Sequence, residues 1–292
     1  MSVTPSTDWA GLYHAYGRAA DVPEQLAALS ASDPVVRRAA GSALVGSVCH
    51  QGTRWPASAP VVPELVALVD TPSTPDRDTI LHLLHAVAIG NVPDDELPFN
   101  PARAFAEADR VRPADEDAVL RVLFEEEEPD VDAVADVADA VALRWAAEAY
   151  RAAQRHTTSF LAWLRDPDPA VVSLAAALLV WFPPVPGLSG ALTAVPCDTA
   201  DARASANLAL AHLPGRLDSE ESAALTVCLA SQHEAIRVTA ALALARRQPT
   251  ALPDAALSVL VHADAVEVAG AVRGWDRSLR GHVAVALRRL GL

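Results

Sequence analysis

Asp78, His82 and His85 have a spacing that could hold a metal ion. They are four and three residues apart, so on a helix they would lie on one face. Carboxylate and imidazole groups are common zinc ligands. The residues between them are mainly large and aliphatic, however, which is typical of an amphipathic helix with a solvated polar face. We therefore predict no metal and no cofactor.

A second group of residues could supply a nucleophile and a base. Cys49 is followed directly by His50, and an imidazole beside a thiol can activate it for nucleophilic catalysis. Neighbouring residues on a helix point about 100° apart, however, and no third group that would orient the imidazole is evident. We therefore predict no catalytic residue.

The polar segment 50–55 is the strongest candidate for a binding surface. In a purely structural interpretation, Gly52 is the left-handed cap of a helix, His50 bonds the last carbonyls and Trp55 packs under the loop. The functional alternative is an interface patch shared with the preceding element, because aromatic residues and arginine commonly anchor interfaces. The binding residues of this alternative are His14, Tyr16, His50, Gln51, Arg54 and Trp55.

The charged residues exclude several classes of enzyme. All 23 basic residues are arginine, which rules out a phosphate-loop lysine, a lysine Schiff base and a Ser–Lys catalytic pair. The net charge of −14 opposes binding to a nucleic-acid backbone. Residues 237–292 nevertheless contain eight arginines against four acidic residues. We expect a basic carboxy-terminal end on an acidic body.

The composition favours an all-α fold. Hydrophobic residues make up 51% of the chain and aromatic residues only 5%. Alanine and leucine, the strongest helix formers, dominate the apolar set. The longest apolar run, 174–182, is far shorter than the roughly 20 residues that cross a bilayer, so a buried helix is expected there and no membrane partner.

The cysteines and the amino terminus favour a cytoplasmic location. Cys49, Cys197 and Cys228 are an odd and widely spaced set, which does not suggest a disulfide framework. Residues 1–9 lack the basic start and apolar stretch of a signal peptide. A reducing cytoplasm is the expected compartment.

One pattern recurs along the chain: a short helical segment, a tight polar turn and a longer helical segment. Asp and Pro in these turns fit helix starts, where Asp accepts bonds from the first amides and Pro lacks an amide that would need a partner. Such hairpins stack into repeat proteins. The longer helices are predicted at 35–48, 170–182 and 235–247, after turns at 33–34, 166–169 and 232–234.

Arginines occupy equivalent positions after several of these turns. Arg37, Arg203, Arg237 and Arg280 align in this way. Acidic residues three or four positions earlier can pair with three of them, along the helix or between stacked hairpins, so a structural role is favoured over phosphate binding. Arg203 has no such partner, and its role is left open.

The region after the first hairpins is less regular. Residues 91–113 contain four prolines and several acids, so we predict a loop-rich insertion at about 91–114. Helices are expected at 115–124 and 131–154. The acidic turn at 125–128 between them is expected to be solvated, with contact to a basic partner as the alternative.

Three stretches resemble HEAT-repeat proteins. These are 14–17 with 21–23, the His-Gln-Gly-Thr segment 50–53 with 59–65, and 160–182 with its doubled Asp-Pro. The chain is similar, more narrowly, to HEAT-repeat domain-containing proteins of actinobacteria. Val172 departs from the pattern, which usually has Arg there. The resemblance implies one domain over residues 1–292, a right-handed α-solenoid of HEAT-type hairpins.

Two classes of function follow from these features. The first is a non-catalytic scaffold, adaptor or immunity-like inhibitor that binds another protein on the concave surface of the solenoid. The acidic charge favours a basic partner. The alternative is a HEAT-like enzyme or nucleic-acid-acting protein, similar to DNA glycosylases of this fold, that uses a carboxy-terminal basic groove.

Overall fold

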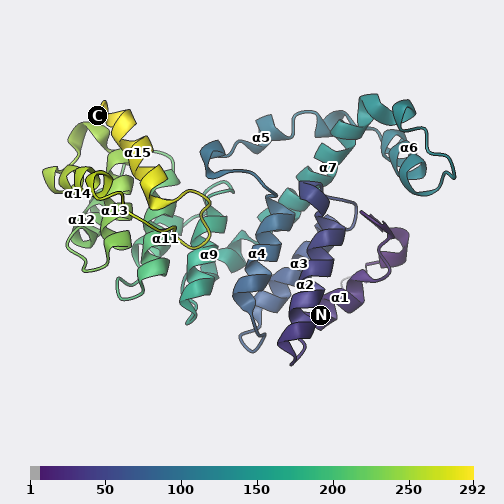
Figure 1. Cartoon of the computed structure of the whole chain (residues 1–292), viewed down its shortest axis with the longest axis horizontal. Coiled ribbons are helices and arrows are strands. Elements are labelled where there is room, and N and C mark those ends of the chain that lie inside the picture. Colours follow the sequence, from purple (N-terminus) through teal and green to yellow (C-terminus); the bar gives the residue numbers. More distant parts are fainter. Residues whose placement is uncertain (1–6) are drawn as a thin grey trace. The chain divides into compact units, whose positions relative to one another are not determined.

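The protein is mostly helical, as the composition predicts (Figure 1). The computed structural model describes residues 7–292, which form fifteen α-helices, several short 3-10 helices and one two-stranded hairpin. The all-α prediction is therefore confirmed. Residues 1–6, part of the segment used to predict the cytoplasmic location, lie outside the described residues. No helix within 7–292 has the length and apolar character that crossing a membrane requires.

The chain divides into two compact units. Unit 1 comprises Met1–Val92 and Asn100–His156, and unit 2 comprises Pro93–Phe99 and Thr157–Leu292. Each unit is described separately below. The single continuous domain stays a prediction.

Unit 1 begins with a small hairpin that the composition does not predict. Its strands β1 and β2 pair in antiparallel register, His14 opposite Gly17. The helix α1 then packs on α2, α3 packs on α4, and the long α7 lies against both α3 and α4. The elements are β1 (Tyr13–His14), β2 (Gly17–Arg18), α1 (Val22–Ala28), α2 (Pro34–Val48), α3 (Ser58–Asp70), α4 (Arg77–Ala88), α5 (Pro101–Ala104), α6 (Pro113–Phe124) and α7 (Ala135–Gln154).

Unit 2 is a series of helix hairpins. The pairs α8 with α9, α10 with α11, α12 with α13 and α14 with α15 are in contact. The helix α11 packs on both α9 and α13, and Figure 1 shows it between them. The helix α15 also packs on α13. The elements are α8 (Thr157–Trp163), α9 (Pro169–Leu179), α10 (Leu188–Thr193), α11 (Ala200–His212), α12 (Ser219–Cys228), α13 (Glu234–Arg247), α14 (Asp254–Ala265) and α15 (Leu279–Leu290).

Local sequence explains where the longer helices begin. Asp33 accepts a hydrogen bond from the Val35 amide at 2.8 Å, and Asp168 accepts one from the Ala170 amide at 2.9 Å. In both helices proline follows the Asp, at a position whose amide needs no partner. The apolar run 174–182 lies in and just after α9 and is buried, as predicted.

Small side chains let the central helices of unit 2 approach one another. In α11 every residue from Ala202 to His212 is buried, and six of these eleven residues are Ala or Ser. Helices lined by small residues pack at short interaxial distances. The core of unit 2 is therefore built around α9, α11 and α13.

The irregular stretch predicted at 91–114 holds short helical pieces up to residue 112, and α6 begins at Pro113. Its first part, Pro93–Phe99, belongs to unit 2 and is called the strap below. Asp94 Oδ2 accepts hydrogen bonds from the amides of Asp276 and Arg277, at 2.9 and 3.2 Å. The Phe99 ring packs edge-on against Trp181. The strap is thus anchored by specific contacts and is not a free loop.

Candidate functional site

Tyr16 and His50 come together at the end of α2, as the predicted binding patch requires. The Tyr16 hydroxyl lies 3.1 Å from His50 Nδ1, and the rings meet edge-on with centroids 5.3 Å apart. His50 Nδ1 also lies 3.2 Å from the Gly46 carbonyl oxygen, which is the bond expected of a helix-capping histidine. Tyr16 is 69% exposed, so its ring is available to a partner.

His14 has a structural role within the hairpin. Its Nδ1 accepts a hydrogen bond from the Tyr16 amide at 3.1 Å, so the proton of a neutral ring is on Nε2. That nitrogen lies 2.8 Å from Asp21 Oδ1. Because both ring nitrogens are used and the side chain is buried, His14 offers a partner little surface.

The turn that follows α2 places Gln51 at the surface and Arg54 inside. Gln51 and Gly52 both have positive φ, 49° and 87°, so the left-handed turn extends over two residues. Arg54 donates to the Gly52 carbonyl at 2.7 Å. Its guanidinium lies against Gly90, where a Cβ atom would collide with it. Burial lowers the pKa of Arg54. This environment suits a residue that holds the turn together and does not suit an exposed contact with a partner.

Trp55 packs into a cluster of core residues. Its ring stacks on Trp145 with centroids 5.5 Å apart and meets Phe124 edge-on at 5.7 Å. The cluster is formed by Val119, Val122, Val134, Val141 and Trp145 from α6, α7 and the segment between them. The structure therefore supports packing under the loop for this residue and leaves Tyr16, His50 and Gln51 as the accessible part of the predicted patch.

The acidic turn after α6 is tied to the amino-terminal hairpin. Glu125 pairs with Arg18 at 3.0 Å and accepts a hydrogen bond from the Tyr13 hydroxyl. The Tyr13 ring stacks on Phe124, and the Arg18 guanidinium lies 3.9 Å from the Tyr13 ring centroid. This acid has a structural partner and is not simply solvated.

The two sequence patterns with catalytic or metal chemistry do not form such sites. Cys49 donates to the Ala86 carbonyl at 3.2 Å, and burial raises the pKa of its thiol. The ring of His50 has Tyr16 and the Gly46 carbonyl as neighbours. Over residues 7–292 no three His, Cys, Asp or Glu side chains are grouped as metal ligands, and this includes Asp78, His82 and His85 of α4.

Three of the four aligned arginines bind backbone carbonyls at the end of the preceding helix or in the turn after it. Arg37 donates to the carbonyls of residues 31 and 32, and Arg237 to those of residues 231 and 232. Arg203 donates to the carbonyls of residues 192, 193 and 195. In addition Arg37 pairs with Asp76 and Arg280 with Glu267. The structural role is as expected, but the acidic partners are not the neighbours on the same helix.

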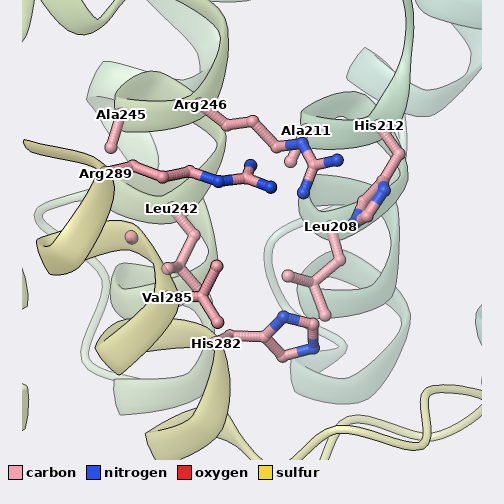
Figure 2. A pocket seen from close by; sticks show the side chains of 10 residues that line it. Leu208, Ala211, His212, Leu242, Ala245, Arg246, His282, Val285 and Arg289 are labelled. Atoms are coloured by element: carbon pink, nitrogen blue, oxygen red, sulfur yellow. The ribbon is translucent and has the colours of Figure 1, made fainter. Parts of the chain in front are cut away.

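A pocket in unit 2 is the clearest binding feature that sequence patterns missed. It lies among α11, α13 and α15, and Figure 2 shows His212, Arg246 and Arg289 pointing toward one another from these three helices, with the His282 ring lying apart from them. The lining combines small or branched aliphatic residues with two arginines and two histidines. We call it the basic pocket and define it by His212, Arg246, His282 and Arg289.

The basic pocket contains unpaired polar groups. His212 Nδ1 and His282 Nε2 are buried and have no hydrogen-bond partner among residues 7–292. Arg246 donates to the Leu97 carbonyl of the strap at 3.1 Å. Burial and then the nearby Arg289 lower the pKa of Arg246 to about 10. In the described part of the chain neither arginine has a carboxylate partner, and no acidic residue lines the pocket.

The buried histidines predict a loss of stability in mild acid. Burial, followed by the charges of Arg277 and Arg246, lowers the pKa of His282 to about 4, against about 6.5 in an unfolded chain. Between these values the unfolded state binds a proton that the folded state does not. Stability is therefore complete above about pH 6.5 and falls towards pH 4, by about 1.4 kcal/mol per pH unit for this residue.

This pH dependence is measured by urea unfolding of the wild type and of His282→Gln at several pH values between about 7 and 4.5. The carboxylates are common to both proteins, so the difference in slope isolates the histidine. We expect a shallower slope for the variant. Parallel slopes would show that His282 titrates normally in the folded protein.

Comparison with known protein families, with curated proteins and with solved structures finds no match to this chain. The functional interpretation therefore rests on the residues and their geometry.

Proposed function

We propose that this protein is a non-catalytic binding protein built from HEAT-type hairpins in a right-handed α-solenoid. The observation that carries the proposal is the packing order in unit 2, where the second helices α9, α11, α13 and α15 contact one another in succession. Stacked hairpins of this kind present a broad surface formed by several helices. Such a surface suits recognition of another macromolecule and needs no catalytic pocket.

The proposed partner is a basic protein, with the chain acting as a scaffold, adaptor or immunity-like inhibitor in the cytoplasm. The net charge of −14 supports this choice, because complementary charge accelerates encounter and disfavours wrong partners. We place the contact on Tyr16, His50 and Gln51, since these members of the predicted patch are exposed or partly exposed. The other members of the predicted patch make internal contacts that hold this surface in place; they are His14, Arg54 and Trp55.

The proposal is tested by capture of partners on the immobilised full-length chain from a lysate of the native cells. The informative variant combines Tyr16→Ser with Gln51→Ala. The matched control is Val227→Ser on α12, since Val227 is 70% exposed and Tyr16 is 69% exposed. We expect a basic protein that is retained by the wild type and the control, and retained at least about fivefold less by the double variant.

Two results would contradict this. Equal capture by all three baits would move the contact away from the amino-terminal patch. Absence of any protein that the wild type retains above bare resin would remove the protein-binding class itself.

The second candidate is a nucleic-acid-acting protein of the DNA glycosylase type. The observation that favours it is the pair Arg246 and Arg289, which lies in the basic carboxy-terminal region without a carboxylate counter-ion among residues 7–292. Fluorescence anisotropy with duplex DNA at low and high salt separates the two classes. Binding that weakens steeply with salt supports this candidate, and absence of binding at low salt excludes it.

A further inference from the structure

The basic pocket has the size of a small ion. Its cavity is about 40 Å³, which corresponds to roughly three water molecules. The walls are apolar and come from Leu208 of α11, Leu242 of α13 and Val285 of α15. The polar groups are grouped together, as the guanidinium groups of Arg246 and Arg289 and the ring of His212 show in Figure 2. A ligand of this pocket is therefore compact, and its polar part faces the arginines.

The positive charges of the two pocket arginines favour an anionic ligand. Two guanidinium groups from different helices lie close enough for Arg289 to lower the pKa of Arg246. Like charges at close range repel each other, and the described residues supply no carboxylate to offset them. Arg246 uses one nitrogen on the Leu97 carbonyl, and this contact with the strap orients the group. Within residues 7–292 its other N–H groups have no hydrogen-bond partner and can bind a ligand.

His212 adds a donor beside the arginines without adding charge. His212 is only 8% exposed, and its Nδ1 has no partner among residues 7–292. Its ring packs on Trp275 with centroids 5.3 Å apart, which fixes its orientation. Burial lowers the pKa of both His212 and His282, so both rings are neutral at pH 7. A neutral imidazole can place its one proton on the unpaired nitrogen and donate it to an oxyanion.

We propose that the basic pocket binds the dianion of a phosphate group, as free phosphate or as the terminal group of a small phosphate monoester. A phosphate monoester carries a charge close to −2 at pH 7, which matches the two guanidinium groups. Arginine also binds phosphate oxygens through two parallel hydrogen bonds. This inference goes beyond the proposed protein-binding function and does not depend on it.

The arrangement disfavours related anions for physical reasons. A carboxylate such as acetate carries a single charge and leaves one guanidinium unpaired. A phosphodiester is also a monoanion, and it has two substituents that must leave a cavity of about 40 Å³. Arg289 is exposed at the edge of the pocket. A monoester can therefore place its phosphate inside and keep its single substituent in solvent.

Calorimetric titration of the full chain near neutral pH tests this proposal with four probes. Inorganic phosphate and methyl phosphate are the expected ligands, and acetate and dimethyl phosphate are the monoanionic comparators. We expect both dianions to bind at least about tenfold more tightly than either comparator. Tighter binding of inorganic phosphate identifies a free-phosphate site, and binding of methyl phosphate with equal or higher affinity identifies a site that accepts a monoester.

A matched pair of variants on α15 locates the binding. Arg289→Gln removes a pocket guanidinium, and Arg288→Gln removes the exposed neighbour, whose Nε donates to the Ala284 carbonyl. Both variants change the net charge equally. We expect Arg289→Gln to weaken methyl phosphate binding about tenfold or more and Arg288→Gln to change it less than about twofold. Melting temperatures confirm that both variants are folded.

Three outcomes would overturn the proposal. They are equal weakening by Arg288→Gln and Arg289→Gln, binding of dimethyl phosphate as tight as that of methyl phosphate, and no heat of binding for either dianion with folded wild-type protein. None of them affects capture of a protein partner by the amino-terminal patch, so failure of one proposal is distinguishable from failure of the other.

Discussion

Replacing Arg203 with methionine should lower the free energy of unfolding by about 4 kcal/mol. Arg203 is 1% exposed and donates five hydrogen bonds, two of them to Asn207 and three to carbonyls at the end of α10. Methionine fills much of the same space and satisfies none of these acceptors. Buried carbonyls without a donor then carry their full desolvation cost. Urea unfolding followed by circular dichroism measures the change.

The matched control is Arg237→Met in the next hairpin. Arg237 is partly buried and, among residues 7–292, donates only to the carbonyls of Ser231 and Gln232. Water can replace these contacts in part, so we expect a loss of about 1 kcal/mol. Equal losses in the two variants would mean that burial of the Arg203 network contributes nothing beyond the shared carbonyl contacts.

Trp55→Ala is expected to lower the free energy of unfolding by about 3 kcal/mol. The substitution removes the stacking on Trp145 and the edge contact with Phe124 and leaves a cavity beside the core cluster. A loss of this size is readily measured as a shift in the urea midpoint. It also means that Trp55→Ala is unsuitable as a test of binding, because a weaker interaction could arise from unfolding.

Two further substitutions separate packing from surface effects. Trp55→Phe keeps an aromatic ring and removes an indole nitrogen that is buried without a partner among residues 7–292, so we expect a loss below about 1.5 kcal/mol. Tyr16→Ala changes an exposed side chain and should stay within about 0.5 kcal/mol of the wild type. A Trp55→Ala protein as stable as Tyr16→Ala would show that the stacked rings do not stabilise unit 1.

The sequence predicts the helix hairpins well because the residues that start their helices act locally. Asp33 with Pro34 and Asp168 with Pro169 act within a single turn of backbone, so the start of each helix follows from adjacent residues. The long helix expected at 131–154 is also present as α7, with a 3-10 turn at its start. The hairpin of β1 and β2 was missed, because two-residue strands leave no periodic pattern.

Contacts between distant residues could not be predicted in the same way. Arg37 pairs with Asp76 and not with Asp33, because Asp33 caps its own helix. The contact of Trp55 with Trp145 depends on the packing of α7 against the helix α3 that follows Trp55 in the chain. Hydrophobic periodicity says which face of a helix is buried, but not which other helix covers it.

The basic pocket could not be predicted from the sequence either, because it also depends on contacts between distant residues. Its four polar residues come from three helices and share no motif or regular spacing. The sequence shows an excess of arginine in residues 237–292, and the pocket arginines Arg246 and Arg289 belong to this region, but the sequence does not indicate that these two face one pocket. The neutral state of His212 and His282 depends on burial, which a sequence does not state directly.

The strap determines when, during synthesis of the chain, the contacts of unit 2 can be completed. Synthesis proceeds from the amino terminus, so Pro93–Phe99 leaves the ribosome long before its partners exist. The bond from the Asp276 amide to Asp94 spans 182 residues of chain. Unit 2 therefore reaches its final set of contacts only when translation is almost complete, and a chain that stalls before residue 276 emerges with the carboxylate of Asp94 still lacking these amide donors.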